Sequence, residues 1–117
     1  MATSDPNCIF CKIVRREIAA REVLRDEYVV AFHDLSPVAP AHVLVVPTLH
    51  AADLSDFVAG EQPETLARLL RAAAEIGARL GPKGYRVVAN TGSDGGQTVH
   101  HLHVHVLAGR QMTWPPG

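Results

Sequence analysis

Residues 101–107 read HLHVHVL, and this alternation of histidine with aliphatic residues predicts a β-strand over residues 99–107. Because successive side chains point to opposite faces of a strand, His101, His103 and His105 share one face. The aliphatic residues between them can then enter the core. Three imidazoles in one row have three interpretations: a solvated polar face, a row of metal ligands, or a catalytic group in which a neutral imidazole attacks an electrophile.

The loop before this strand is rich in glycine. Residues 91–98 read TGSDGGQT, in which Gly92, Gly95 and Gly96 allow backbone N–H groups to form an anion-binding concavity. Gln97 and Thr98 add side-chain donors. A glycine-rich loop alone is most often a hairpin turn. This loop leads directly into the histidine row, so a bound phosphate would lie near His103 and His105, which favours phosphoryl or nucleotidyl chemistry.

Outside the histidine strand, the sequence predicts one long helix and four further strands. Apolar residues spaced by three or four place the helix at Pro63 to Leu80, with an apolar stripe of Leu66, Leu69, Leu70, Ala73, Ile76 and Leu80. Strands are expected at 22–25, 28–34, 43–46 and 85–90, and a short helical turn within 8–17. The last two strands are too close in sequence for a helical crossover, so we expect them to pair antiparallel in an α+β fold.

The composition is that of an ordinary globular domain. Of the 117 residues, 47% are hydrophobic and 20% are charged, and the net charge of −1 offers no basic excess for a nucleic-acid backbone. No stretch approaches the ~20 apolar residues of a membrane span, and the polar N-terminus lacks an apolar signal core. We expect one domain over residues 1–117, with a loose arm at 1–7, in the cytoplasm and without a nucleic-acid or membrane partner.

Two cysteines, Cys8 and Cys11, form a C-x-x-C pair. They are too few for a disulfide scaffold, and a thioredoxin-like redox pair would need a preceding strand, which does not fit before residue 8. The remaining interpretations are two thiols without a shared role or half of a zinc site. Two thiolates need two more ligands to close a tetrahedral zinc site.

Three long segments resemble the histidine triad (HIT) family, in particular its Hint branch of purine nucleoside phosphoramidases. They are IFCKIVRREI at 9–18, AFHDLSPVAPAHVLVVP at 31–47 and KGYRVVANTGSDGGQTVHHLHVHVLAGRQMTWPPG at 83–117. The resemblance covers nearly the whole chain, and the triad with the closing GRQM-x-WPPG is highly specific. It implies a five-stranded antiparallel sheet with one long helix and a short N-terminal helix. It also implies a homodimer.

The resemblance implies a covalent mechanism. His103 would be the nucleophile that attacks the α-phosphorus of a phosphoramidate such as AMP-lysine or AMP-NH2, and water would release AMP from the nucleotidyl-histidine. His105 would hydrogen-bond the phosphate or the leaving group, and His42 would help to orient the nucleophile. Alternatives are a dinucleoside polyphosphate hydrolase, or a nucleotide-binding interaction protein whose hydrolysis is incidental.

The family's nucleotide pocket also maps onto this chain. Asp34 would accept the ribose hydroxyls. The base would lie among five residues that otherwise look like core: Ile9, Phe10, Ile13, Phe32 and Leu35. The phosphate would meet Asn90, Gly96, Gln97 and Thr98, and Trp114 would come from the neighbouring subunit. Thr98, His100 and Thr113 stand where the branch commonly has serine, tyrosine and histidine, which leaves the leaving-group preference open.

The C-x-x-C pair departs from vertebrate-type Hint proteins. Zinc-binding HIT relatives, including the galactose-1-phosphate uridylyltransferase branch, complete such a site with a downstream histidine and the first histidine of the triad row. The resemblance therefore implies one structural zinc per subunit, held by Cys8, Cys11, His50 and His101. His33 and His100 receive no specific role.

Overall fold

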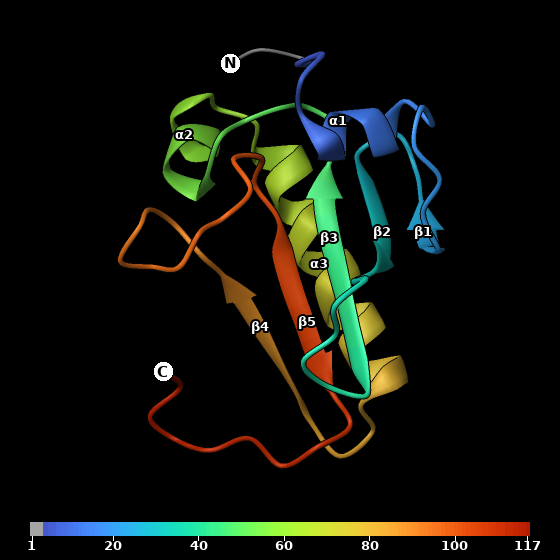
Figure 1. Cartoon of the computed structure of the whole chain (residues 1–117), viewed down its shortest axis with the longest axis vertical. Helices are drawn as coiled ribbons and strands as arrows, with labels where there is room; N and C mark the ends of the chain where they lie inside the picture. The colour runs from blue at the N-terminus through green and yellow to red at the C-terminus, as the bar shows by residue number, and fades with distance from the viewer. Residues whose placement is uncertain (1–3) are drawn as a thin grey trace.

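Five strands form one antiparallel sheet in the computed structural model, which describes residues 4–117 (Figure 1). The elements, in chain order, are α1 (Ile9–Val14), β1 (Glu22–Arg25), β2 (Val29–His33), β3 (Ala41–Pro47), α2 (Leu54–Ala59), α3 (Pro63–Leu80), β4 (Tyr85–Ala89) and β5 (Val104–Ala108). The prediction of an α+β fold with one long helix is confirmed, and α3 has the bounds expected from the sequence. The short helix α2 was not predicted.

The strand order is β1-β2-β3-β5-β4, and every neighbouring pair is antiparallel. The last strand of the sequence, β5, therefore lies inside the sheet between β3 and β4 (Figure 1). His105 of β5 is opposite Leu44 on one side and Val88 on the other. This central position holds the backbone around His105 between two neighbouring strands.

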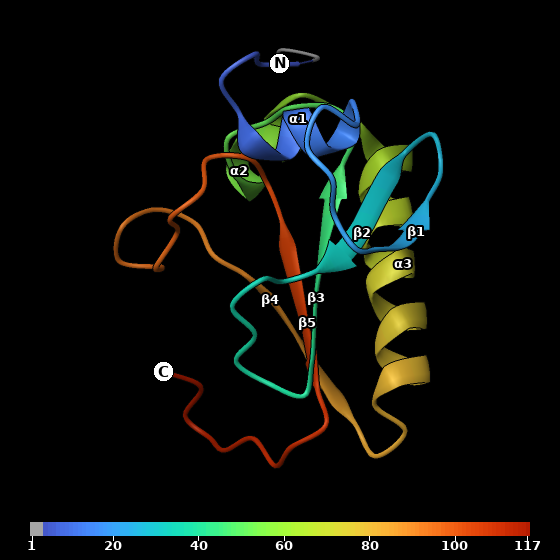
Figure 2. The same ribbon diagram turned by 45° about the vertical axis from the view of Figure 1, so that its right-hand side comes forward.

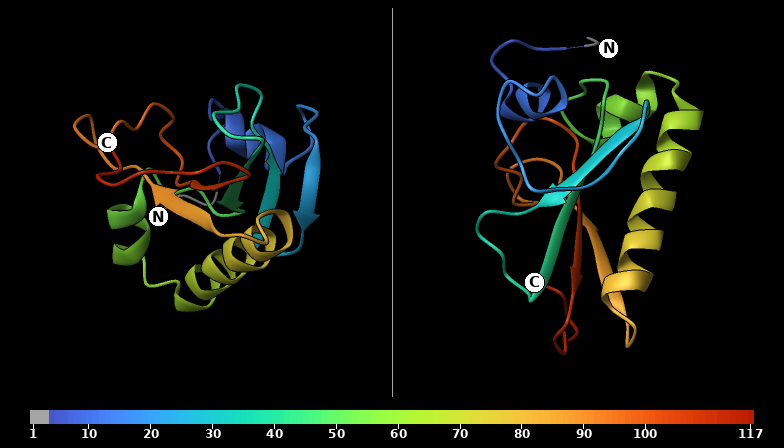
Figure 3. Two further views of the ribbon diagram at one scale, coloured as in Figure 1. Left: turned by 90° about the horizontal axis from the view of Figure 1, so that it is seen from below. Right: turned by 90° about the vertical axis from the view of Figure 1, so that its right-hand side faces the viewer.

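The two faces of the sheet are covered differently. Helix α3 packs along one face, while α1 and the long loops lie over the other (Figures 2 and 3). The core under α3 is the larger and includes Val43, Val45, Leu69 and Ile76. The smaller cluster on the opposite face comprises Phe10, Ile13, Val30, Phe32, Leu44 and Val46. The histidines are thus on a face that only short elements cover.

The predicted stripe of α3 is correct except at Leu70. Leu69, Ala73 and Ile76 are buried, whereas Leu70 is 52% exposed. The buried positions of α3 centre on residues 65, 69, 72, 73, 76 and 77, so Leu70, about 100° around the helix from Leu69, lies outside the stripe.

The strand predicted over 99–107 begins only at Val104 and ends at Ala108. Residues 99–103 leave the sheet because the Leu102 N–H donates to the Ala51 carbonyl oxygen at 2.8 Å rather than to a neighbouring strand. Leu102 itself is buried, 1% exposed. His101 and His103 consequently lie in an irregular segment that precedes β5, and of the three histidines in this row His105 alone is in a strand.

The ends of the chain add two observations. Of the expected loose arm at 1–7, residues 1–3 are outside the described part of the chain, and Asp5 accepts the Cys8 N–H at 3.2 Å in a turn that leads into α1. Among the helices of residues 4–117, none combines the length and apolarity that crossing a membrane requires.

Candidate active site and metal-binding cluster

His103 has one ring nitrogen free to react. Its Nδ1 lies 2.8 Å from the carbonyl oxygen of His101, and because a carbonyl can only accept, Nδ1 must carry the proton. Nε2 then keeps its lone pair. The side chain is only 6% exposed, and its ring packs edge-on against Phe10 with centroids 5.1 Å apart. This hydrogen bond orients the ring with Nε2 as the nitrogen available for nucleophilic attack.

A hydrogen-bond chain fixes the opposite tautomer of His105. The Val38 N–H donates to His42 Nδ1 at 3.1 Å, so the proton of neutral His42 is on Nε2. That Nε2–H donates to His105 Nδ1 at 2.9 Å, which leaves the proton of His105 on its own Nε2. The resemblance implied that His42 helps to orient the nucleophile, and in the structure its Nε2–H hydrogen bond goes to His105. The ring centroid of His105 is 5.0 Å from that of His103.

Burial favours the neutral forms of His42 and His105. Desolvation, with the neighbouring rings of His103 and His42, lowers the pKa of His105 to about 4. Desolvation also lowers the pKa of His42, against the opposing effect of the Asp34 carboxylate. At neutral pH, His105 is thus an uncharged donor through Nε2–H.

Asp34 follows β2 and lies close to His42 and His105. Its Oδ2 is 3.5 Å from His42 Nε2, while its Oδ1 accepts the Ser36 N–H at 2.7 Å. Ligand atoms of Asp34, His42 and His105 lie within 4.8 Å of one another, a spacing that could hold a cation. However, metal ligation through His42 Nε2 would move its proton to Nδ1, against the Val38 N–H. The protonation pattern favours a hydrogen-bond network over a metal site here.

A second cluster of candidate metal ligands combines two cysteines with two histidines. Donor atoms of Cys8, Cys11, His50 and His101 lie within 4.8 Å of one another. His101 Nδ1 is 3.3 Å from Cys8 Sγ and 3.1 Å from His50 Nδ1. The structure brings together the four residues that the resemblance implied.

His101 is prepared as a ligand by its second nitrogen. Its Nε2–H donates to the Pro47 carbonyl oxygen at 3.0 Å, which leaves the lone pair on Nδ1, inside the cluster. Burial lowers the pKa of His101 to about 4, so the ring is neutral as ligation requires. Two cysteine sulfurs and two imidazole nitrogens are the donor set of closed tetrahedral zinc sites.

Local structure explains why the two thiols converge. Cys8 is the N-cap of α1, and its Sγ accepts the Cys11 N–H at 3.3 Å. The C-x-x-C spacing therefore places both sulfurs at the first turn of α1. His50 follows the end of β3, and His101 belongs to the segment that enters β5. Four candidate ligands from three parts of the chain thus come together.

Comparison with known proteins identifies the family of this chain. Residues 15–112 match the model of the HIT domain. This chain belongs to the HIT family. A HIT family hydrolase from Legionella pneumophila has a similar structure, with a TM-score of 0.88 and 46% sequence identity over 95% of this chain and all of that one. A histidine triad protein from Clostridium difficile gives 0.87 and 41% over 94% and 96%. A 14 kDa zinc-binding protein from Zea mays is 44% identical over 97% of this chain and 90% of its own length.

The apolar residues that the family places around a base are not all core residues in this HIT protein. Phe10, Ile13 and Phe32 are buried, and the Phe10 and Phe32 rings pack with centroids 5.6 Å apart. Ile9 is 48% exposed and Leu35 is 94% exposed. Large apolar side chains that are exposed in this way can contact a ligand, which a core interpretation would not explain.

The glycine-rich loop of the HIT protein is held by the amides that were expected to bind phosphate. Gln97 Nε2 donates to the Ala52 carbonyl oxygen at 2.7 Å, and Asn90 Nδ2 donates to the Gly95 carbonyl oxygen at 2.6 Å. Both amides therefore position the loop instead of facing outward. Gly96 has φ of +79°, a conformation that favours glycine, and Thr98 is exposed.

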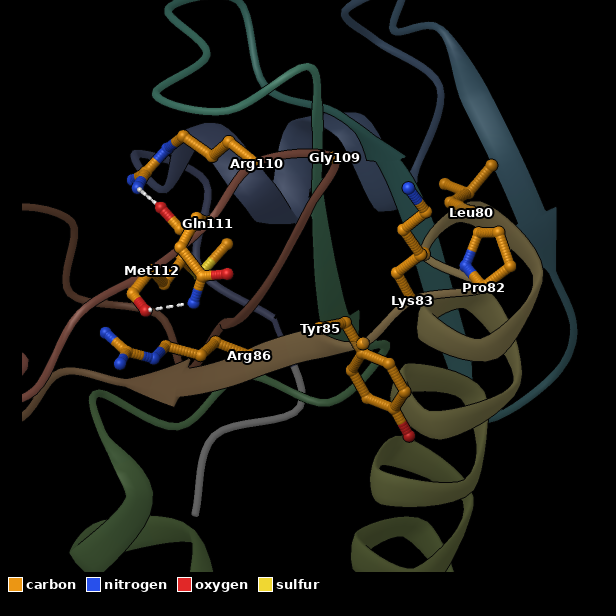
Figure 4. A pocket seen from close by; sticks show the side chains of 11 residues that line it. Leu80, Pro82, Lys83, Tyr85, Arg86, Gly109, Arg110, Gln111 and Met112 are labelled. Carbon is orange, nitrogen blue, oxygen red and sulfur yellow. Dashed lines mark hydrogen bonds between the residues drawn. The ribbon is translucent and has the colours of Figure 1, made fainter.

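A cavity at the opposite end of the β4–β5 pair from the glycine-rich loop has no histidine in its lining. Its volume is about 680 Å³, and residues 80–86 and 109–112 line it at the end of the β4–β5 hairpin (Figure 4). Arg110, one of its cations, donates through Nε to the Val38 carbonyl oxygen at 3.0 Å. The cavity lining includes no histidine, cysteine or carboxylate, so its chemistry differs from that of the candidate active site.

Proposed function

We propose that this HIT protein is a hydrolase of the Hint branch that cleaves purine nucleoside 5′-phosphoramidates. The carrying observation is the pair of tautomers described above: His103 presents a free Nε2, and His105 beside it presents an Nε2–H. Membership of the HIT family and the likeness to the Legionella hydrolase support the assignment.

In the proposed reaction, His103 Nε2 forms a bond to the α-phosphorus and the P–N bond to the amine breaks. Water then attacks the nucleotidyl-histidine, and AMP leaves. In sum one water is consumed, with its hydroxyl on phosphorus and its other hydrogen on the amine. His105 Nε2–H donates a hydrogen bond to the phosphate or the leaving group, where it stabilises developing charge.

In the proposed pocket, the exposed side chains of Ile9 and Leu35 close over the base, against the buried layer of Phe10, Ile13 and Phe32. The Asp34 carboxylate accepts the ribose hydroxyls. Gly96 and Thr98 provide a backbone N–H and a hydroxyl for the phosphate. Asn90 and Gln97 support these contacts by holding the loop.

The proposal includes one structural zinc per subunit, held by Cys8, Cys11, His50 and His101. The donor set and the neutral, oriented His101 support this, as does the likeness to the maize protein named for zinc binding. Free thiols in such a cluster suit a reducing compartment, which supports a cytoplasmic location. Elemental analysis of protein purified without chelator or metal column should give one zinc per chain, and a folded chain that is isolated without zinc under these conditions would contradict the proposal.

A homodimer is also part of the proposal. Strand β4 is at the edge of the sheet and pairs only with β5 within the described chain. Its side chains Tyr85 and Val87 are exposed, as are Leu70 on α3 and Trp114 in the tail, which is 82% exposed. A second copy at this edge would cover apolar surface and bring Trp114 to a neighbouring site. Sedimentation equilibrium should give twice the chain mass.

A fluorogenic AMP-lysine analogue tests the activity. The wild-type chain should turn it over, and His103→Ala should lose activity at least about 1,000-fold, because covalent catalysis is removed. Ordinary turnover by His103→Ala would exclude the assigned nucleophile. Faster turnover of diadenosine polyphosphates would favour the polyphosphate hydrolase, and tight AMP binding without turnover would favour an interaction protein.

A further inference from the structure

Helix α1 touches both the metal-binding cluster and the proposed nucleotide site. Cys8 caps its N-terminus and Cys11 is within it, and Phe10 lies between these two cluster residues. The Phe10 ring packs edge-on against His101 at 5.9 Å and against His103 at 5.1 Å between centroids. One aromatic side chain therefore contacts a cluster ligand and the proposed nucleophile.

The N-terminal turn of α1 is held by core packing of Phe10 in the smaller cluster and by the residues of the metal-binding cluster. The helix has six residues, too few to be stable without tertiary contacts. Its C-terminal end is held by Arg25, whose guanidinium donates to the carbonyl oxygens of Val14 at 2.9 Å and Ile13 at 3.1 Å. The opposite end is anchored through Cys8 and Cys11. What these sulfurs bind therefore adds to the core packing that positions Phe10.

His101 provides a second connection between the two sites. Its ring contributes Nδ1 to the cluster, and its carbonyl oxygen accepts the Nδ1–H of His103 at 2.8 Å. A movement of residue 101 that follows metal binding or release also moves the acceptor that orients His103. Phe10 and His103, which belong to the proposed nucleotide site, therefore both contact residues of the metal-binding cluster or lie beside them in the chain.

We infer that metal binding at the Cys8, Cys11, His50 and His101 cluster and nucleotide binding beside His103 are positively coupled through Phe10 and α1. Each ligand raises the affinity for the other, and linkage requires the two factors to be equal. We expect a factor of about 10, within the usual range for coupled sites. The inference rests on the proposed function because its probe is AMP.

Binding measurements test the coupling without reference to turnover. Calorimetry gives the Kd for AMP of the zinc-loaded and the chelator-stripped full chain, with circular dichroism to confirm that both are folded. Competition against a chelator of known affinity gives the Kd for Zn²⁺ with and without saturating AMP. Stripped protein should bind AMP about 10-fold more weakly, and AMP should tighten zinc binding by the same factor.

Two substitutions locate the coupling. Phe10→Leu keeps all four metal ligands but removes the ring contacts with His101 and His103, so the effect of AMP on zinc affinity should fall below about twofold. Phe57→Leu is the matched control, because Phe57 is a fully buried aromatic residue of α2 in the core on the α3 side of the sheet. It should keep the factor of about 10.

The outcomes separate the inference from the proposed function. AMP binding that is equal with and without zinc would overturn the coupling and leave the nucleotide site intact. The absence of AMP binding in both forms would overturn both proposals. If stripping unfolds the chain, AMP raises zinc affinity in any variant by stabilising the fold. In that case the increase in zinc affinity at saturating AMP is compared between wild type and Phe10→Leu. An equal increase would overturn the coupling, and a smaller increase in Phe10→Leu would support it.

Discussion

Replacing His42 with alanine should reverse the tautomer of His105. In the native chain, His42 Nε2–H donates to His105 Nδ1 at 2.9 Å, and the proton of His105 stays on Nε2. Without His42, the Asp34 carboxylate becomes the partner within reach, since ligand atoms of the three residues lie within 4.8 Å. His105 Nδ1–H would then donate to Asp34, and Nε2 would present a lone pair to the substrate.

The size of the effect follows from the hydrogen bond that is lost. A hydrogen bond to a charged phosphate contributes about 1.5–3 kcal/mol. If it is made in the transition state, its loss lowers kcat/KM by about 10- to 150-fold. This is less than the loss expected for His103→Ala, because His103 remains able to form the covalent bond.

The assay combines kinetics with a direct view of the proton. Turnover of the fluorogenic AMP-lysine analogue gives kcat/KM, and ¹⁵N NMR of the imidazoles shows which nitrogen of His105 is protonated. His42→Gln keeps an amide donor for His105 Nδ1 and should recover most of the activity. His33→Ala is the control, because strand alternation places His33 on the opposite face of β2 from Phe32, and its activity should stay within about twofold.

The reasoning would be refuted if His42→Ala retained kcat/KM within about threefold of wild type while folded, since that loss is below one hydrogen bond to a charged group. A His105 that stays protonated on Nε2 in His42→Ala would refute it equally, because the tautomer would then have another cause.

Three further measurements concern stability. Gly77→Ala should lower the free energy of unfolding by about 1–3 kcal/mol in urea titrations, because the new Cβ would lie 2.4 Å from the Tyr85 ring; in a Tyr85→Ala background it should be stabilising, and stabilisation in the native background would contradict the packing. Arg25→Leu should cost about 1–2 kcal/mol through its two bonds to α1, against less than about 0.5 kcal/mol for Arg71→Leu in an exposed ion pair; equal costs would contradict the capping role. The pKa of His105 is lowered to about 4 in the folded chain, so between pH 6.5 and 4 the unfolded chain binds more protons than the folded chain. The free energy of unfolding should therefore fall as the pH drops from 6.5 towards 4. His105→Gln should show a shallower fall, and identical slopes would contradict the assignment.

Regular patterns in the sequence were sufficient for the main elements. The bounds of α3 are predictable because an apolar period of three to four residues ends at Gly81-Pro82 and begins with a proline in the first turn. Helix α2 has only six residues, and its pattern is too short to be recognised before the fold is known. The alternation in 99–107 is misleading, because Leu102 alternates as a strand residue would but donates its N–H to the Ala51 carbonyl oxygen outside the sheet.

The candidate site, like the fold, was predictable only in part from the sequence. Histidines and cysteines are visible in the sequence, and the resemblance implied the four-residue cluster that the structure assembles. The partners that fix their tautomers are not visible, because they are backbone groups: the Val38 N–H, the Pro47 carbonyl and the His101 carbonyl. The His105 partner of His42, and the hydrogen bond that ties Gln97 to the distant Ala52 carbonyl oxygen, depend on tertiary contacts that cannot be read from residue types.

The strand order has a consequence for the chain during its synthesis. Strands β1, β2 and β3 emerge from the ribosome first and can form a meander, but the inner edge of β3 has no neighbour until β5 is made. His101, which belongs to the metal-binding cluster, and His103, the proposed nucleophile, emerge immediately before that strand. A nascent chain therefore completes its sheet, the proposed metal site and the proposed nucleophile in one late event, and a chain that terminates before residue 101 has none of the three.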